Sequence, residues 1–415
     1  MALIVQKFGG TSMGGPDRIK NVARRAVATH RAGNQVVVVV SAMAGETDRL
    51  LQLAKEISAR PSDREIDVLL ATGEQVSIAL LALAIRELGV EARSLLGHQV
   101  QIRTDSVHGS ARIRTIEAQP VTEALAMGEI VVVAGFQGVD EHGNITTLGR
   151  GGSDLSAVAM AAALHADACE IYSDVDGIYT TDPNIYHKAR KLARINCEEM
   201  LEMASLGAKV LQTRSVEFAL KHKVALHCRS SFSDAEGSWV MPEPLEVQGV
   251  TVISMEGIAV TGVTIDAKTA KLTVKGIRDV PGAVAKLFAP LAEHQINVDV
   301  IIQNPPTGGL TDVSFTVPSD VADQAFALTQ SLQNVLYFQD ITIDKNVAKV
   351  SVVGAGMRTQ PGVALRTFAA LGDAGINILL ISTSEIKISC VIEASLTAKA
   401  VQVLHDAFAL ELPPG

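Results

Sequence analysis

The chain has 415 residues, of which 47% are hydrophobic and 20% charged, and its formal net charge is −9. This length is typical of two or three domains with ample material for a core, and the composition excludes a disordered chain. A negative net charge and a single tryptophan argue against nucleic-acid binding, which needs a basic face and stacking aromatic rings. Small anionic ligands would therefore have to be held by local cations.

The cysteines and the apolar runs indicate the compartment. The four cysteines are scattered without C-x-x-C spacing, which is typical of reduced thiols that pack in a core. The apolar start, Met1 to Phe8, is too short for a signal peptide, and we expect no run to approach the roughly 18 apolar residues of a membrane span. The sequence thus predicts a soluble, cytoplasmic protein that contacts neither membranes nor nucleic acid.

The first expected element is a short buried strand that begins at Ala2 and leads into a glycine-rich loop. The lysine of this loop precedes its glycines, so the loop is not a Walker A motif. Lys7 would project from the strand end beside the amides of Gly9 and Gly10, a group that can bind phosphate. A plain glycine hairpin explains the pattern equally well.

The next strand is predicted over Gln35 to Val40, a continuous β-branched run. Such runs are typical of sheets covered on both faces, which indicates a parallel sheet. A second small-residue loop follows, with Ser41 and Thr47 as candidate ligand hydroxyls. Strands and helices then alternate to about residue 230, which is the pattern of one α/β domain.

A long helix is expected over Asp67 to Leu88, interrupted at Thr72 to Glu74. A carboxylate at a glycine break between apolar helices can point into a binding site. Glu74 is therefore a candidate site residue, although a solvated acid is the commoner case.

A glycine turn at Gly149 to Gly152 opens the most informative stretch of the sequence. We expect Ser153 to cap the helix that follows, whose free N–H groups would bind anions, while Arg150 adds a forked cation. Asp154 stands where the third glycine of a dinucleotide-binding motif belongs, so a Rossmann site is disfavoured. An ordinary strand-turn-helix remains the plain alternative.

After that helix, Ala168 to Ser173 is predicted to be a buried strand that delivers Asp174 to its carboxyl end. Open α/β sheets bind their ligands at that end. A turn-rich loop with Tyr179 follows, and Lys209 lies near a later helix start. Each of these groups is also compatible with an exposed position.

The last part of the chain contains an internal repeat at a spacing of 80, in which Pro281-Gly282 recurs as Pro361-Gly362. Two such units predict two small α+β modules. The second copy lacks a final strand, so we expect Ile258 to Val263, upstream of the first copy, to pair antiparallel with Ala348 to Val353. The first module would then be inserted within the second.

Four motifs resemble those of the aspartate kinase family, over essentially the whole chain: Lys7–Ser12, Gly149–Asp154, Ser173–Pro183 and Gly207–Lys209. The resemblance implies an α/β fold, namely a three-layer αβα amino-acid kinase domain with a mainly parallel sheet, plus two α+β ferredoxin-like ACT regulatory domains. It places the kinase domain at residues 1–248, the first ACT domain at 264–343, and the second at 257–263 and 344–415.

The implied reaction is transfer of phosphate from MgATP to the side-chain carboxylate of L-aspartate, for lysine, methionine and threonine synthesis. The implied catalytic residues are Lys7, Asp174 and Lys209. The implied ATP-binding residues are Lys7, Phe8, Gly9, Gly10, Ser173, Asp174, Tyr179, Asp182, Asn184 and Lys209. The implied aspartate-binding residues are Ser41, Thr47, Glu74, Arg150, Gly151, Gly152, Ser153 and Asp154.

The resemblance also implies regulation by lysine, threonine or both. The allosteric candidates are Asp279, Asn297, Asp299, Gln303, Asn377 and Ile378, although the asparagines can simply make tight turns. ACT pairing would give a homodimer, a homotetramer, or a heterotetramer with a shorter regulatory chain. An amino-acid-binding protein with a degenerate kinase domain is the alternative, against which the retained Lys7, Lys209, Arg150 and Asp174 argue. Glu74 disfavours an acetylglutamate kinase, whose substrate has no ammonium group.

Overall fold

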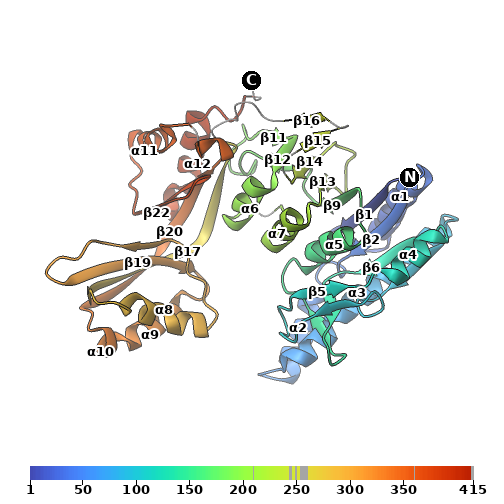
Figure 1. Ribbon diagram of the computed structural model, residues 1–415, viewed down its shortest axis with the longest axis horizontal. Coiled ribbons are helices and arrows are strands. Elements are labelled where there is room, and N and C mark those ends of the chain that lie inside the picture. The colour runs from blue at the N-terminus through green and yellow to red at the C-terminus, as the bar shows by residue number, and fades with distance from the viewer. Residues whose placement is uncertain (209, 243–244, 248–249, 253–259, 359, 413–415) are drawn as a thin grey trace. The chain divides into compact units, whose positions relative to one another are not determined.

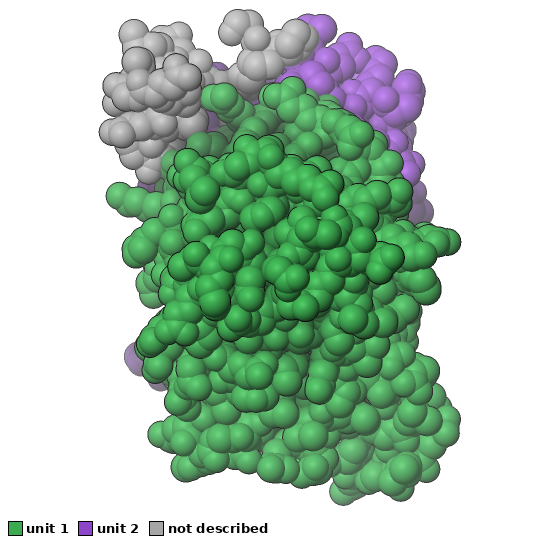
Figure 2. Space-filling model, turned by 90° about the vertical axis from the view of Figure 1, so that its right-hand side faces the viewer, with its two compact units in different colours: residues 1–178, 191–204, 209–253 green, residues 179–190, 205–208, 254–415 purple. Residues whose placement is uncertain are grey.

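The structure is a computed structural model that describes the whole chain except residues 209, 243–244, 248–249, 253–259, 359 and 413–415 (Figure 1). It divides into two compact units, which Figure 2 colours separately. The first comprises residues 1–178, 191–204 and 209–253, and the second comprises residues 179–190, 205–208 and 254–415. Each unit has its own sheet and its own core.

The first unit is built on an eight-stranded sheet of order β12-β14-β13-β9-β1-β2-β6-β3. Its strands are β1 (Leu3–Phe8), β2 (Gln35–Val40), β3 (Ala92–Leu95), β6 (Ile130–Ala134), β9 (Ala168–Ser173), β12 (Arg194–Asn196), β13 (Leu226–Ser230) and β14 (Ser238–Met241). The described pairs are parallel, apart from β13 with β14. The predicted mainly parallel sheet is confirmed.

Helices cover this sheet on both faces, which explains the unbroken valine run of β2. Val36, Val38 and Val40 join the core cluster that contains α1 (Pro16–Arg31) and α3 (Asp63–Glu87). Successive strand residues point to opposite faces, so the equally buried Val37 and Val39 face the other layer. That layer contains α5 (Gly152–Ala163), which contacts β1, β2 and β9.

Smaller elements complete the first unit. A four-stranded sheet of order β5-β4-β7-β8 contains β4 (Ile102–Thr104), β5 (Ile113–Ile116), β7 (Gln137–Val139) and β8 (Ile145–Thr147). The remaining helices are α2 (Glu46–Ile57), α4 (Gln119–Ala126), α6 (Cys197–Ser205) and α7 (Thr213–His222). Short ribbons pair β10 (Ile178–Tyr179) with β11 (Lys191–Leu192), and β15 (Leu245–Val247) with β16 (Val250–Val252).

Helix α3 corrects two expectations. It runs unbroken from Asp63 to Glu87, so the predicted interruption is wrong. A Cβ atom at Gly73 would lie 2.8 Å from the Cβ of Ala42, so this glycine permits close packing against the loop after β2 and does not break the helix. By length and composition α3 could also cross a membrane, contrary to expectation, but half of its apolar window is buried inside the protein.

The second unit carries a six-stranded sheet of order β18-β19-β17-β20-β22-β21. Its strands are β17 (Gly262–Arg278), β18 (Ile301–Gln303), β19 (Leu310–Pro318), β20 (Asp340–Val353), β21 (Leu380–Thr383) and β22 (Lys387–Glu393). Its helices are α8 (Ala283–Glu293), α9 (Ala322–Ser331), α10 (Gln333–Leu336), α11 (Val363–Asp373) and α12 (Thr397–Ala407), with short 3₁₀ turns η1 (Ala355–Arg358) and η2 (Ala394–Leu396). Two separate apolar cores correspond to the two sequence repeats.

Strands β17 and β20 are long, and each forms part of the sheet in both repeats (Figure 1). The start of β17 pairs antiparallel with the end of β20, with Val263 opposite Val352, and the rest of β17 pairs with β19 and the start of β20. The strand upstream of the first repeat therefore completes the sheet of the second, as the topology argument predicted. Two details differ: the strand begins at Gly262 and continues to Arg278, and residues 258 and 259 lie outside the described part of the chain.

Candidate active site

The site is placed by four adjacent parallel strands that end at one edge of the first sheet. Phe8, the last residue of β1, is level with Val40 on β2 and Tyr172 on β9, and Val40 is level with Ala134 on β6. The loops after these strands therefore start side by side. They contain four of the sequence candidates, Gly9, Gly10, Ser41 and Asp174, and also Gly135, so these four candidates lie at one edge of the sheet.

Lys7 is a buried cation at this edge. Its Nζ lies 2.5 Å from Oδ1 of Asp154, and both side chains are nearly inaccessible to solvent. Asp154 lies in the first turn of α5, so the ion pair joins the end of β1 to the helix that follows the glycine turn. A Cβ at Gly9 would lie 3.4 Å from the same Nζ, so the backbone of Gly9 passes close to the ammonium group.

The glycine turn before α5 adopts a backbone that requires glycine. Gly149 and Gly151 have φ values of 79° and 71°, and a Cβ at Gly151 would lie 2.2 Å from Cγ of Gln212. Gly151 is the N-cap, so the expectation that Ser153 caps the helix is wrong. The helix starts two residues earlier than expected because glycine tolerates the positive φ, and its N-cap makes no side-chain hydrogen bond. Such a start can bind an anion, with the exposed Arg150 beside it.

Ser153 has a different contact. It is buried within α5, and a Cβ at Gly135 would lie 2.8 Å from its Cβ. The lack of a side chain at Gly135 thus lets α5 approach the loop after β6. Gly152 is packed equally closely, against Leu148 and Phe136.

Glu74 is a buried carboxylate with unequal oxygens. Only 3% of the residue is exposed, and Oε1 accepts a hydrogen bond of 2.9 Å from the backbone N–H of Ala42. Oε2 is buried without a hydrogen-bond partner among the described residues. Burial raises the pKa of the Glu74 carboxyl to about 7. An ammonium group bound at Oε2 would satisfy this oxygen and favour the ionised form.

The two hydroxyl candidates flank the same loop. Ser41 follows β2 directly, and its N–H donates to the carbonyl of Phe8 at 3.1 Å. Thr47 lies in the first turn of α2. Both residues are half-buried.

The nucleotide candidates divide between the two units. Phe8 is buried and Ser173 half-buried at strand ends of the first unit, where Asp174 is exposed. Tyr179, Asp182 and Asn184 belong to the second unit. Lys209 lies outside the described residues.

The segment of residues 179–190 has its own contacts within the second unit. The N–H and Nδ2 of Asn184 donate to Oδ1 of Asp182 at 2.8 and 3.0 Å, which closes an exposed turn. The hydroxyl of Tyr186 donates to Asp406 of α12 at 2.5 Å, and Thr180 bonds to His405 at 2.9 Å. The motif of residues 173–183 thus continues into a segment that packs on α12, the last helix of the second repeat.

Two charged residues that sequence reasoning missed contact the residues just before the glycine turn. Asp67 on α3 is fully buried, and Arg214 on α7 donates to the backbone carbonyls of Leu148 and Ala111. The one signal for Asp67 is its place seven residues before Glu74, two turns earlier on the same face of α3.

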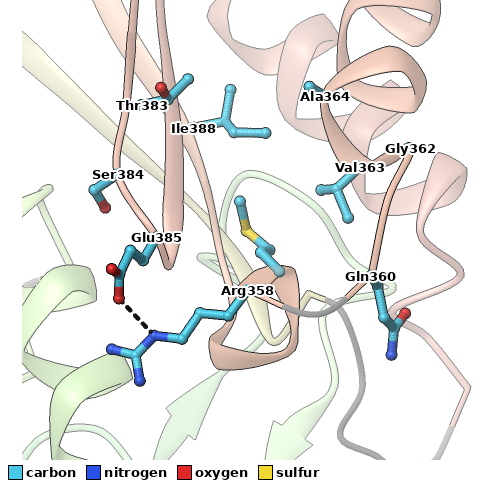
Figure 3. Close-up of a pocket in the computed structure, with 10 residues that line it drawn as sticks. Arg358, Gln360, Gly362, Val363, Ala364, Thr383, Ser384, Glu385 and Ile388 are labelled. Atoms are coloured by element: carbon cyan, nitrogen blue, oxygen red, sulfur yellow. Dashed lines mark ion pairs between the residues drawn. The ribbon is translucent and has the colours of Figure 1, made fainter.

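Each repeat of the second unit has a pocket beside its Pro-Gly turn. Asp279 and Gln303 line the pocket of the first repeat, a cavity of about 470 Å³. The pocket of the second repeat, about 520 Å³, is lined by Arg358 and Glu385, which point toward one another and pair at 3.0 Å (Figure 3).

The other allosteric candidates lie elsewhere in the repeats. Asn297 and Asn377 are exposed after their helices, and Ile378 packs against the second core. Asp299 forms an ion pair with the buried Lys349 of β20.

The comparisons with known proteins agree with this architecture. Residues 2–230 match the amino acid kinase family, and residues 272–336 and 350–408 match ACT domains. An aspartate kinase of Stutzerimonas stutzeri (strain A1501) is 51% identical over 415 residues, which cover 100% of this chain and 99% of the relative.

Solved structures extend the comparison. The chain is similar to E. coli aspartokinase III in complex with aspartate and ADP, with a TM-score of 0.79 and 26% identity over 98% of this chain and 99% of that one. The same enzyme in complex with lysine and aspartate gives a TM-score of 0.76 and 27% identity over 98% and 99% of the two chains. The chain therefore belongs to the aspartate kinase family, with an amino acid kinase domain followed by ACT domains, and it is an enzyme of that class.

Proposed function

We propose that the protein transfers the γ-phosphate of ATP to the side-chain carboxylate of L-aspartate and releases 4-phospho-L-aspartate. The observation that carries this proposal is the pair of buried charges at one sheet edge, Lys7 held by Asp154 and Glu74 with one unpartnered oxygen. The first suits a phosphate and the second suits an ammonium.

The chemistry needs no general base, because the aspartate side chain, with a reference pKa of about 3.9, is already ionised at neutral pH. The reaction needs neutralisation of the phosphates and alignment of two anions that repel each other. Lys7 supplies a fixed cation, and Asp154 holds it in place before substrate arrives. The backbone N–H groups near Gly9, Gly10, Gly151 and Gly152 add donors around the transferred group.

For the acceptor, we assign Glu74 to the α-ammonium and Arg150 to a substrate carboxylate. Ser41, Thr47 and Ser153 complete the polar wall of the pocket. For the nucleotide, we assign Lys7, Asp174 and Lys209 to the phosphates, and Tyr179, Asp182 and Asn184 to the remainder of ATP. The ADP complex of E. coli aspartokinase III supports the use of an adenine nucleotide.

Mg²⁺ fits the donor set. Among the described residues no group of three or more His, Cys, Asp and Glu side chains is arranged around one point. Mg²⁺ in kinases is typically held by one or two carboxylates together with the phosphates, so Asp174 with the nucleotide suffices. When bound, the ion would neutralise charge on the phosphate oxygens.

We also propose feedback inhibition by lysine, threonine or both at the pockets beside the Pro-Gly turns. Arg358 and Glu385 offer opposite charges to a zwitterionic amino acid, and Asp279 offers a carboxylate in the first repeat. The complex of E. coli aspartokinase III with lysine supports the choice of lysine as a ligand. Millimolar lysine or threonine should lower activity, and the regulatory proposal fails if neither amino acid changes activity or melting temperature.

Assembly through the ACT modules is the proposed quaternary state. Ile301 and Ile381 occupy equivalent repeat positions on the edge strands β18 and β21, and 50% and 40% of their surfaces are exposed. A second copy of this chain, or a shorter regulatory chain, would cover them. The protein would act in the cytoplasm, in lysine, methionine and threonine synthesis.

The test of the proposed reaction is aspartate-dependent release of ADP from ATP, with the acyl phosphate trapped as a hydroxamate by hydroxylamine. We expect hydroxamate to form in proportion to ADP when aspartate is present, and far less of it with L-glutamate. L-Glutamate serves as the control acceptor. ADP release without hydroxamate would contradict transfer to a carboxylate.

A further inference from the structure

Asp67 is a fully buried carboxylate with an unusual number of bonds to one region. It accepts hydrogen bonds from Thr147 Oγ1 at 2.5 Å and from the N–H of Gly109 at 3.1 Å, and it lies 2.8 Å from Nδ1 of His108. Charge-assisted bonds of this kind are the stronger ones in proteins, and burial excludes competing water. Asp67 therefore holds Thr147 and the loop of residues 108–109 in fixed positions.

Both partners of Asp67 border the glycine turn. Thr147 ends β8 two residues before Gly149, and a Cβ at Gly149 would lie 3.1 Å from the carbonyl oxygen of Gly109. Arg214 fixes the intervening residue, because its guanidinium donates to the carbonyl of Leu148 at 2.7 Å. The backbone that leads into Arg150 is thus held from two sides by buried polar contacts.

Asp67 and Glu74 lie on the same rigid helix. They are seven positions apart, which is two turns or roughly 10 Å along α3, and both residues are buried. One helix therefore carries Glu74, the carboxylate assigned to the substrate ammonium, and, through Asp67, the anchor of the turn that carries Arg150. The spacing between the two ends of the acceptor pocket is fixed by this helix.

We propose that Asp67 is a positioning residue which, through Thr147, sets the distance between Glu74 and the Arg150 turn and so selects an acceptor of the length of aspartate. The proposal rests on the assignment of Glu74 and Arg150 to the acceptor. Asp67 itself touches no substrate. If the role of Asp67 were purely structural, its loss would instead lower the stability of the protein and weaken the binding of aspartate and ATP alike.

The test compares Thr147→Val with Thr147→Ser. Valine keeps the shape of threonine but cannot donate to Asp67, whereas serine keeps the hydroxyl. We expect Thr147→Val to raise KM for aspartate about 10-fold, since a displacement of the order of 1 Å can cost up to about 100-fold. KM for ATP and kcat should stay within about twofold, and Thr147→Ser should resemble the wild type.

The ratio of kcat/KM for aspartate to that for L-glutamate is the second readout. This ratio should fall in Thr147→Val and in Asp67→Asn, because a looser turn discriminates less between the side-chain lengths of aspartate and glutamate. An unchanged KM for aspartate in folded Thr147→Val, or a parallel rise in KM for both substrates, would overturn the proposal. A wild-type protein without aspartate-dependent activity would instead refute the proposed function itself.

Discussion

The residues proposed for the acceptor and those proposed for the nucleotide are held differently. Among the residues proposed for the acceptor, Glu74 is buried in α3 and Ser153 in α5. Among those proposed for the nucleotide, Asp174 is exposed in the first unit and Asp182 is exposed in the second. Charges enclosed by folding must be paired or shift their pKa, so the acceptor side is organised before substrate arrives.

The difference follows from what each ligand brings. Aspartate is small and depends on the protein for counter-charges to its ammonium and carboxylates, whereas ATP brings Mg²⁺ and many polar groups of its own. Substitutions on the acceptor side should therefore change aspartate kinetics specifically. Substitutions in the segment of residues 179–190 should act on the nucleotide.

The largest effect is expected for Lys7→Ala. Loss of one preorganised charge-stabilising group typically costs about 10²- to 10³-fold in rate, so kcat should fall by that factor while aspartate binding weakens far less. Steady-state kinetics with saturating ATP measures both. Lys20→Ala, on the exposed face of α1, is the matched control. An unchanged kcat in the Lys7 variant would remove this residue from the mechanism.

Glu74→Gln should affect the acceptor alone. A hydrogen bond to a charged group contributes about 1.5–3 kcal/mol, so KM for aspartate should rise roughly 10- to 100-fold while KM for ATP changes little. Glu87→Gln, an exposed carboxylate on the same helix, should leave both constants unchanged. Equal rises in both KM values would contradict the division between the two sides.

Tyr186→Phe should have the smallest effect and the opposite selectivity. Removing its hydroxyl breaks the bond to Asp406 and costs about 0.5–1.5 kcal/mol of local stability. Because this segment also carries Asp182 and Asn184, KM for ATP should rise a few-fold and KM for aspartate should not. His187→Ala, an exposed neighbour, controls for general disturbance of the segment. A rise in KM for aspartate alone would contradict the proposed division between acceptor and nucleotide residues.

Much of the architecture could be predicted because it depends on local patterns. The valine run of β2 can be stable only between two covering layers, and the glycine loops after strands mark the carboxyl edge of the sheet. The pairing of the start of β17 with the end of β20 could be predicted by counting strands. An ACT module needs four strands, and the second repeat supplies only three, so the fourth must come from elsewhere in the chain.

Apart from the N-cap of α5, what sequence reasoning missed depends on contacts between residues distant in the sequence. Gly73 is a site of close packing only because Ala42 lies against it, and no local pattern reveals that. The pairing of Lys7 with Asp154 and the role of Asp67 likewise depend on which loops the sheet brings together. Sequence patterns therefore indicated candidate site residues, but not the contacts that hold them.

The central claim is that the unpartnered oxygen of Glu74 receives the ammonium group of aspartate, and the pH dependence of aspartate binding tests it most directly. Burial raises the pKa of Glu74 to about 7, so binding to the ionised form must release a proton at lower pH. Calorimetric titration without nucleotide between pH 5.5 and 7.5 should show the aspartate Kd rising almost 10-fold for each pH unit well below 7, with proton release. Glu74→Gln should show a weak, pH-independent Kd. A wild-type Kd that is the same at pH 5.5 and pH 7.5 would contradict the account.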